Sequence, residues 1–247
     1  MNCRRLVLQH TYNTRDMGGY PTPDGVTRWQ QFYRSDDLTE LSERDIRSLQ
    51  QSGVTDLIDL RSDEERFTYP YPELHGFSIH YAPLAVGEVS DLTTLGIGDL
   101  SNLQISDFYM LWLEKSKAQI NKIFTAFSQA EGASLFHCRA GKDRTGIIAM
   151  LLLGLAGVSE ADILTDYQMT YTYIRLNQLL TASVEKGLED PWMHSDIEQM
   201  DRVLVFIKER YGSVWGYLNS GCGLPELTLE AVRGRLVEKA GNLPAES

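Results

Sequence analysis

Residues 134–158 read SLFHCRAGKDRTGIIAMLLLGLAGV, in which two apolar runs enclose a polar loop. The first run, 134–137, has the length of a buried strand, and the second, 147–158, has the length of a buried helix. The second run is also far shorter than the ~20 apolar residues that a membrane-spanning helix needs. The stretch therefore predicts a strand that ends at Cys138, a loop, and a helix that begins near Arg144.

The rest of the chain indicates strands that alternate with helices, followed by a helical final third. Strand-like apolar runs occupy 28–34, 54–60 and 77–84. Helical patterns follow Ser42, which has Asp45 three residues later, and cover 106–129, and in the final third 160–173, 196–211 and 229–239 after Ser159, Ser195 and Thr228. This order predicts an α/β fold with a mostly parallel central sheet flanked by helices and a helical C-terminal part. In such sheets ligands bind at the carboxyl ends of the strands.

The sequence shows no sign of a boundary between domains. The sequence contains no internal repeat, low-complexity tract or Pro/Ser-rich linker, so we expect a single domain over 1–247, with 159–247 as its helical part. Residues 85–105 contain three glycines and no sustained periodicity. A loop of that length is expected to be either a lid over a binding site or a surface insertion.

The composition argues against several classes of partner. The chain has 23 Lys and Arg against 34 Asp and Glu, a net charge of −11, which disfavours sequence-independent binding to nucleic acid. No stretch supports stable membrane insertion, and no secretory apolar segment follows Arg4 and Arg5. Cysteines at positions 3, 138 and 222 form no disulfide framework and suit a reducing compartment. A cytoplasmic protein is expected, with export of the folded chain by another route left open.

The loop after the central strand carries residue types that suit phosphoryl transfer through sulfur. The reactive form of a cysteine such as Cys138 is the thiolate, which helix N-termini and cationic groups favour. Backbone N–H groups of a tight loop that leads into a helix form a cradle for an anion. Arg144 offers a planar fork for two phosphoryl oxygens, Lys142 adds a positive charge, and the Thr145 hydroxyl can stabilise sulfur as a leaving group.

These residues lead to a family. The pattern Cys-x5-Arg-Thr resembles the signature of the cysteine-dependent protein tyrosine phosphatases, and the string HCRAGKDRTG is most similar to the bacterial PtpB-like and LipA-like atypical subgroup. Residues 13–19 (NTRDMGG), 33–35 (YRS) and 58–62 (IDLRS) resemble further motifs of that subgroup, with weaker matches at 157–159 and 166–167. The resemblance implies a tyrosine-phosphatase-like fold and hydrolysis of phosphate monoesters through a phosphocysteine, without a cofactor.

The resemblance assigns Cys138 as the nucleophile, with Arg144 and Thr145 as further catalytic residues. The residues expected to bind the phosphate follow the cysteine in the loop: Arg139, Ala140, Gly141 and Lys142. His137 is expected to orient its neighbours through hydrogen bonds rather than to act as a catalyst. The histidines at 10, 75, 80 and 194 do not have metal-ligand spacing, so no metal is expected.

A general acid must protonate the leaving oxygen and then, as a base, activate water. In the subgroup resembled, the aspartate within the loop has been proposed for this role, which implies Asp143. The alternative for Asp143 is an ion pair with Lys142 or Arg139. Asp91 and Asp99, in the long loop, are rival candidates for the acid.

Asp59 and Arg61 form a second pair of interest. They lie two positions apart near the end of a predicted strand, so their side chains share a face. If that strand neighbours the strand before Cys138, Asp59 can lie at the rim of the phosphate site and pair with Arg61. A purely structural ion pair is the other interpretation.

The expected substrate is protein phosphotyrosine. Lys142 makes the loop more cationic and resembles the loops of phosphatases that accept phosphoinositides, so phosphoserine, phosphothreonine or an inositol lipid headgroup are further candidates. The alternative function is a phosphate-recognition module without turnover, although such a module would need the cradle and not the thiol of Cys138. The physiological substrate, the oligomeric state and any redox pairing of Cys138 stay open.

Overall fold

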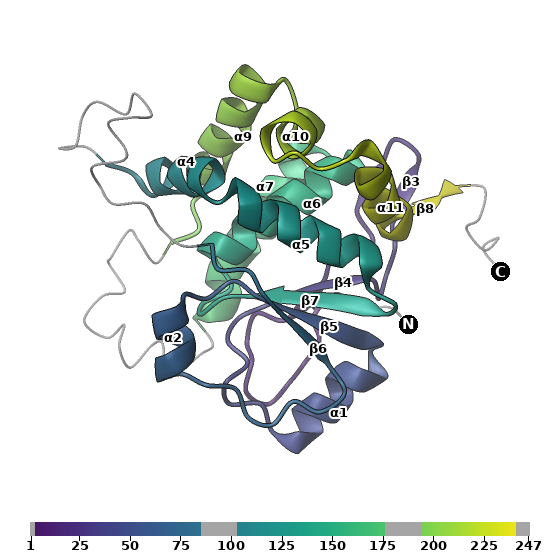
Figure 1. The fold of residues 1–247 in the computed structure, drawn as a ribbon, viewed down its shortest axis with the longest axis vertical. Coiled ribbons are helices and arrows are strands. Elements are labelled where there is room, and N and C mark those ends of the chain that lie inside the picture. Colours follow the sequence, from purple (N-terminus) through teal and green to yellow (C-terminus); the bar gives the residue numbers. More distant parts are fainter. Residues whose placement is uncertain (1–2, 85–102, 176–193, 241–247) are drawn as a thin grey trace.

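The computed structural model describes residues 3–84, 103–175 and 194–240, and in these residues the chain forms a five-stranded central sheet (Figure 1). Its strands, in spatial order, are β1 (Arg15–Asp16), β4 (Phe32–Ser35), β7 (Ala133–His137), β5 (Val54–Asp59) and β6 (Ser78–Tyr81). The pairs β4–β7, β7–β5 and β5–β6 are parallel, and β1 pairs with β4 in antiparallel fashion. The predicted α/β fold with a mostly parallel sheet is confirmed.

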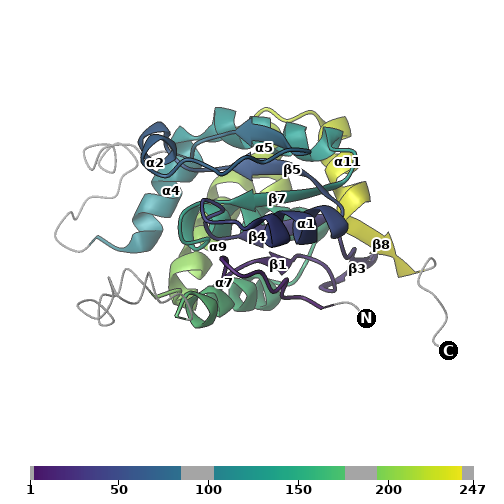
Figure 2. The same cartoon turned by 90° about the horizontal axis from the view of Figure 1, so that it is seen from below.

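Helices cover both faces of this sheet (Figures 1 and 2). Helix α1 (Glu43–Gln51) covers one face, and α2 (Asp63–Thr68) follows the carboxyl end of β5. The other face is covered by longer helices: α4 (Ile105–Lys115), α5 (Lys117–Gln129), α6 (Asp143–Ala156), α7 (Glu160–Ile174), α9 (Ile197–Tyr211) and α11 (Glu226–Leu236). Between α9 and α11 lie the short α10 (Val214–Gly216) and the π-helical turn η3 (Tyr217–Gly221).

The core divides into two parts, one on each face of the sheet, because successive residues along a strand point to opposite faces. On β7, Leu135 packs in a smaller core with Leu49 of α1, whereas Phe136 belongs to the larger core with the helices of the other face. Leu57 and Ile58 on β5 divide in the same way. Helix α6 lies inside the larger core, and 11 of its 14 residues are buried. Its sequence is therefore apolar on all sides, as the run at 147–158 indicates.

The helix expected over 106–129 is two helices, α4 and α5. Ser116 separates them, because its backbone leaves helical geometry with φ −104° and ψ 19°. The break lets each half follow a different neighbour, with α4 packed against α9 and α5 against α11. The apolar pattern alone does not reveal this change of direction, because buried residues continue on both sides of the break.

The helix expected over 229–239 is wrong at both ends. Helix α11 begins earlier, after Pro225, a residue well suited to a helix start because it has no N–H to satisfy. The last three residues leave the helix as strand β8 (Val237–Lys239), which pairs with a strand far away in the chain. That three-stranded sheet has the order β2 (Pro21–Thr22), β3 (Gly25–Thr27) and β8. Pairing with β3 outweighs the local helical pattern.

Two other helix starts can be compared with prediction. Ser159 caps α7 as expected, since its side chain accepts from the N–H of Asp162. Ser195 does not cap α9: its hydroxyl oxygen accepts from the N–H of Tyr171 and donates to the carbonyl of Gln168. Ser195 therefore links α9 to α7 instead of beginning a helix.

The predictions on residues 85–105 and on membrane insertion can be compared only with the residues that the structure describes. Residues 85–102 lie outside these, so the lid or insertion expected at 85–105 stays a prediction. Among the helices at 3–84, 103–175 and 194–240, none is both long and apolar enough to cross a membrane.

Candidate active site

Cys138 directly follows β7, near the middle of the sheet, and is buried with 2% of its surface exposed. The active-site loop, residues 138–144, runs from this point into the first turn of α6. Thr145, in that turn, donates its hydroxyl hydrogen to Cys138 Sγ over 3.2 Å. Gly141 adopts the left-handed φ of +66°, where a Cβ atom would lie 2.5 Å from the carbonyl oxygen of Ser35. Only glycine fits there, so the sequence of the loop determines its tight path.

Arg144 is held by a residue that the sequence analysis did not single out. Its Nη1 and Nη2 donate to Glu65 Oε2 and Oε1 over 2.5 and 2.7 Å. Glu65 is itself fixed at the start of α2, because its Oε2 accepts from the N–H of Ser62 and its N–H donates to the Ser62 hydroxyl, a capping box. Because Glu65 accepts from Nη1 and Nη2 of Arg144, it makes no hydrogen bond with Nε of that guanidinium. Arg144 is therefore oriented before any phosphate arrives.

The pKa values of this pair report the same contact. Burial alone would raise the pKa of Glu65, but the hydrogen bonds from Arg144 and Ser62 lower it below its ordinary value. Burial alone would lower the pKa of Arg144, but Glu65 raises it. Both side chains are therefore charged at neutral pH. For Glu65, the capping-box pattern Ser62-x-x-Glu65 is a sequence signal of its place at a helix start, but it does not reveal the contact with Arg144.

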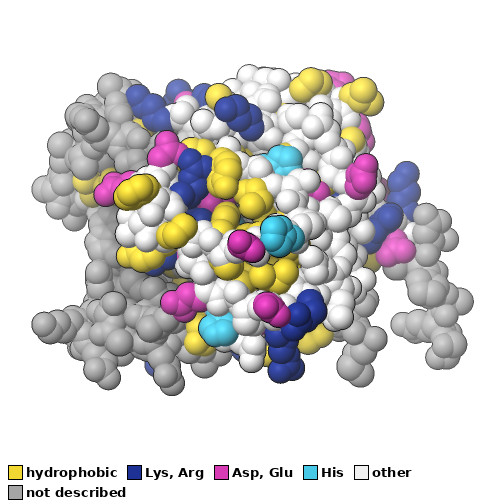
Figure 3. All heavy atoms as spheres, turned by 60° about the horizontal axis from the view of Figure 1, so that its bottom comes forward, with side chains coloured by type: hydrophobic (Ala, Val, Ile, Leu, Met, Phe, Trp, Pro, Cys, Tyr) yellow, Lys and Arg dark blue, Asp and Glu magenta, His cyan; other side chains and the backbone are white. Residues whose placement is uncertain are grey.

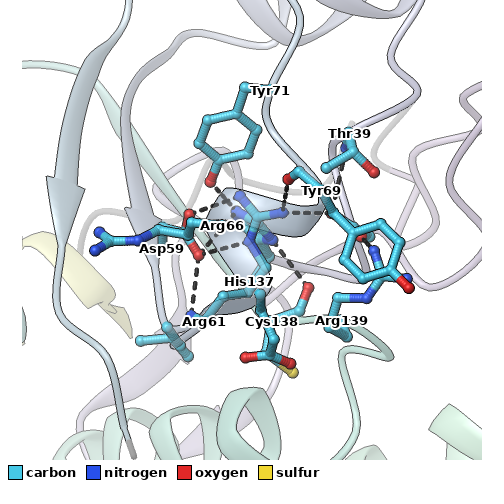
Figure 4. Close-up of polar contacts among 12 residues, drawn as sticks. Thr39, Asp59, Arg61, Arg66, Tyr69, Tyr71, His137, Cys138 and Arg139 are labelled. Atoms are coloured by element: carbon cyan, nitrogen blue, oxygen red, sulfur yellow. Dashed lines mark hydrogen bonds and ion pairs between the residues drawn. The ribbon is translucent and has the colours of Figure 1, made fainter. Parts of the chain in front are cut away.

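A chain of alternating charges connects the loop to β5 (Figure 4). Arg139 forms an ion pair with Asp37 and lies over the ring of Tyr69, 3.6 Å from its centroid. Asp37 also accepts from Arg61 Nη1 over 3.1 Å. Arg61 in turn donates from Nε and Nη2 to the two oxygens of Asp59, over 2.9 and 2.8 Å. Asp59 is fully buried, and its carboxylate pairs with Arg61, which is the geometry of the structural interpretation.

Lys142 and Asp143 face the helices on the other side of the loop. Lys142 Nζ lies 3.0 Å from Asp143 Oδ1 and donates to the carbonyl of His194 over 3.1 Å. The hydroxyl of Tyr109 also donates to Asp143 Oδ1, and Tyr109 contacts the hydroxyl of Tyr167 over 2.8 Å. The lysine side chain is 4% exposed, whereas that of Asp143 is 26% exposed. Of the two ion-pair partners considered for Asp143, the structure places Lys142 beside it. The rival acids Asp91 and Asp99 lie outside the described residues.

The motif residues from the N-terminal part of the chain brace the loop from behind. Arg34 Nη2 donates to the carbonyl of Gly141 over 2.8 Å. Asn13 Nδ2 donates to the carbonyls of Ala140 and Gly141 over 3.2 and 3.1 Å. Asp36 fixes Asn13 by accepting its N–H over 3.0 Å, and burial raises the pKa of Asp36 to about 6 although this bond opposes the rise. The motifs at 13–19 and 33–35 therefore shape the cradle without entering it.

Asp166 on α7 anchors two of these motifs. It pairs with Arg15 Nε over 2.9 Å and with Arg34 Nη1, and all three side chains are buried. Burial alone would raise the pKa of Asp166, but the two guanidinium groups outweigh it and hold the pKa well below its ordinary value of 3.8. The stability that this carboxylate contributes is therefore present above pH ~4 and is lost as the pH falls toward the lowered pKa.

Replacing Asp166 by asparagine is expected to lower the free energy of unfolding by about 3–5 kcal/mol at pH 7, because two buried guanidinium groups lose their counter-charge. Urea denaturation checks this. Asp201→Asn, an exposed aspartate on α9, serves as the control and should change the free energy by less than about 0.5 kcal/mol. The difference between wild type and Asp166→Asn should shrink as the pH falls below ~4, because the unfolded wild-type chain then binds a proton at Asp166 while the folded protein keeps the carboxylate charged. A difference that is small at pH 7 would contradict this role.

Comparisons with known proteins identify the family of the chain. Residues 6–238 match the tyrosine phosphatase family, so the chain belongs to that family and is a phosphatase. A tyrosine-protein phosphatase of Nostoc commune is 32% identical over 219 residues, which cover 83% of this chain and 74% of the relative. The triple specificity protein phosphatase PtpB of Mycobacterium tuberculosis is 25% identical over 93% of this chain and 98% of its own. The crystal structure of P. aeruginosa TpbA is similar with a TM-score of 0.36 and 16% identity, over 60% of this chain and 81% of that one.

Proposed function

We propose that the protein hydrolyses phosphate monoesters through a phosphocysteine on Cys138, with protein phosphotyrosine as its main substrate. The observation that carries this proposal is the hydrogen bond from Thr145 Oγ1 to Cys138 Sγ, at the start of a loop that ends on the oriented Arg144. A hydroxyl held on the sulfur stabilises the thiolate when it leaves phosphorus. The similarity to PtpB over 93% of the chain supports placement in the PtpB-like subgroup.

The proposed reaction has two displacements at phosphorus. In the first, the thiolate of Cys138 forms the S–P bond while the P–O bond to the substrate breaks, and the general acid protonates the leaving oxygen. In the second, the same group takes a proton from water, whose oxygen forms a new P–O bond as the S–P bond breaks. Arg144 and the backbone N–H groups of 139–144 stabilise the phosphoryl oxygens throughout.

Asp143 is the proposed general acid. It lies in the first turn of α6, one residue before Arg144, and its side chain is partly exposed. Its contacts with Lys142 and Tyr109 both fall on Oδ1. The second oxygen, Oδ2, is thus not occupied by either neighbour, and an ion pair with Lys142 is compatible with acid catalysis.

Replacing Asp143 by asparagine should reduce kcat/KM, which reports the first displacement, in a way that depends on the leaving group. The leaving group of a phenyl ester carrying strongly electron-withdrawing groups departs without a proton, so its kcat/KM should fall less than about tenfold. An alkyl phosphate or unsubstituted phenyl phosphate needs the proton, and its kcat/KM should fall about 10²–10⁴-fold. Equal losses on the two substrates would contradict the assignment. The same comparison with Asp91→Asn and Asp99→Asn tests the rivals.

The breadth of substrates depends on how much positive charge the site offers. Lys142 supports acceptance of phosphoserine, phosphothreonine or an inositol headgroup only through its charge, because its Nζ already contacts Asp143 and the His194 carbonyl. The name of the relative PtpB, a triple specificity phosphatase, supports a broad range. We place phosphotyrosine first because Tyr69, an exposed tyrosine whose ring contacts Arg139 of the loop, offers an aromatic neighbour to an aryl ester.

A panel of substrates tests this proposal directly. Phosphate release should be measured from one peptide synthesised with phosphotyrosine, phosphoserine or phosphothreonine, and from a short-chain phosphoinositide. The phosphotyrosyl peptide should have the highest kcat/KM, by about tenfold or more. A faster reaction with the lipid would overturn the order. Binding of inorganic phosphate without turnover of any ester would favour the non-catalytic recognition module.

We infer that the phosphatase is one domain over 1–247. One continuous hydrophobic core includes Met17 and Val237, and it contains residues of the helical part after 159. The three cysteines support a reducing, cytoplasmic setting, because Cys138 must stay reduced to act and none of the three is paired in the structure.

A further inference from the structure

Tyr71 lies next to the active-site loop, although the proposed reaction does not use it. It belongs to the connection between α2 and β6, where Pro70 and Pro72 restrict the backbone on either side. Its hydroxyl contacts His137 Nε2, and the two rings are 5.6 Å apart (Figure 4). His137 is the last residue of β7 and is fully buried beside Cys138. The orientation of the buried His137 ring therefore affects the backbone conformation at the start of the active-site loop.

The hydrogen bonds of His137 identify its tautomer. Nδ1 lies 3.0 Å from the carbonyl oxygen of Cys138, and a carbonyl can only accept, so Nδ1 carries a hydrogen. Burial lowers the pKa of His137 to about 4, although Asp59 opposes the shift, so the ring is neutral at pH 7 and carries one hydrogen. Nε2 must therefore accept. The hydroxyl of Tyr71, which also lies within hydrogen-bonding reach of Asp59, is the donor to Nε2.

The charged groups around the ring favour a different arrangement once Tyr71 is removed. Asp59 Oδ1 lies 3.9 Å from His137 Nε2 and would accept a hydrogen from it. Arg61 neutralises Asp59 through two hydrogen bonds and also lies under the ring of Tyr71, 4.5 Å from its centroid. Arg144 adds positive charge on the side of the loop. Without the Tyr71 hydroxyl, a hydrogen on Nε2 would face the Asp59 carboxylate, which can accept it. An Nε2 atom without a hydrogen would have lost the donor that Tyr71 supplies.

We propose that Tyr71 is a positioning residue of the phosphatase: its hydroxyl holds His137 in the Nδ1–H tautomer, and His137 then orients the carbonyl of Cys138. The Cys138–Arg139 peptide begins the cradle, so the direction of this carbonyl sets the direction of the following N–H. This inference rests on the proposed function only for its effect on activity. The tautomer itself is a property of the resting protein.

The tautomer is tested by ¹⁵N NMR of imidazole-labelled protein, with the His137 signals identified by their loss in His137→Asn. In wild type Nδ1 should give the signal of a protonated nitrogen and Nε2 that of an unprotonated one. In Tyr71→Phe the proton should move to Nε2, or both nitrogens should become protonated. Tyr81→Phe removes the same atom from a residue that lines the same groove of about 320 Å³ and should change nothing. Unchanged His137 signals in Tyr71→Phe would overturn the proposal.

Kinetics test the positioning role separately. Tyr71→Phe should lower kcat about three- to tenfold, the range for one hydrogen bond, with KM changed less than about twofold. Asparagine at position 137 can donate to the carbonyl without a choice of tautomer. In the His137→Asn background, Tyr71→Phe should therefore change kcat by less than about twofold. The same loss in both backgrounds would show that Tyr71 only fills space. If wild type hydrolysed no ester, the proposed function would fail while the NMR result would still be readable.

Figure 3 shows the molecule with the lower side of Figure 1, where α1 lies, brought forward, and hydrophobic side chains gather on this face beside basic ones. The groove next to Tyr71 is lined by Arg61, Arg66, Pro70, Pro72, Leu74, Ile79 and Tyr81. Tyr71 itself lines this groove and is half-buried. The Tyr71→Phe substitution removes the oxygen that contacts His137 and leaves the ring packing in place.

Discussion

Replacing Cys138 by serine is expected to reduce phosphate release by at least ~10⁴-fold, the largest effect of any single change in this protein. A serine hydroxyl is a far weaker nucleophile at neutral pH, and the Thr145 hydroxyl that contacts position 138 is a donor there and would not take its proton. Thr145 would still contact the oxygen, and the cradle and Arg144 would be unchanged. Steady-state phosphate release from a phosphotyrosyl peptide is the measurement.

The binding of inorganic phosphate separates loss of chemistry from loss of structure. Cys138→Ser should bind it within about threefold of wild type, because the N–H groups and Arg144 supply the contacts. Cys3→Ser makes the same change at an exposed cysteine and should keep full activity. Turnover by Cys138→Ser within about tenfold of wild type would contradict the nucleophile assignment.

Replacing Arg144 by lysine is expected to lower kcat/KM by about 10³-fold or more, although the charge is kept. Lysine offers a point charge in place of a planar fork, and it cannot form the two hydrogen bonds that Glu65 makes with Arg144. The phosphoryl group would lose two directed donors as its geometry changes. The measurement is kcat/KM on the phosphotyrosyl peptide, with the melting temperature recorded for each variant.

Arg47→Lys is the matched control, because Arg47 is an exposed arginine on α1 that pairs with Glu43 on the same helix. It should leave both activity and stability unchanged, as expected for an exposed ion pair. Arg144→Lys with kcat/KM within tenfold of wild type would show that charge alone suffices. In that case the orientation by Glu65 would have no catalytic importance.

Much of the fold could be predicted because the decisive residues are local. The strand before Cys138, the loop and the apolar helix α6 follow one another directly, and the capping serines Ser42 and Ser159 lie next to the helices they begin. The secondary-structure predictions were wrong where contacts with residues distant in the chain determine the local conformation. Residues 237–239 form a strand because β3 offers its edge, and 106–129 bends at Ser116 because its two halves have different neighbours.

The same distinction explains the site. The loop residues could be found from their spacing, because one short segment supplies the thiol, the cradle and Arg144. Glu65, Asp166 and Tyr71 could not be assigned from the sequence, because each acts on a residue far from it in the chain. For Asp59 the sequence left two interpretations open. The strand that Asp59 ends, β5, does pair with β7, and the carboxylate is buried against Arg61.

Trapping the phosphocysteine intermediate tests most directly whether the phosphoryl group is transferred to Cys138 before water releases it. The protein should be mixed with an excess of an activated aryl phosphate, denatured within milliseconds, digested and analysed by mass spectrometry. We predict one phosphoryl group on the peptide that contains Cys138, and none on that peptide from Cys138→Ser. Rapid phosphate release by wild type, with an unmodified Cys138 peptide or with the phosphoryl group on another residue, would contradict the account.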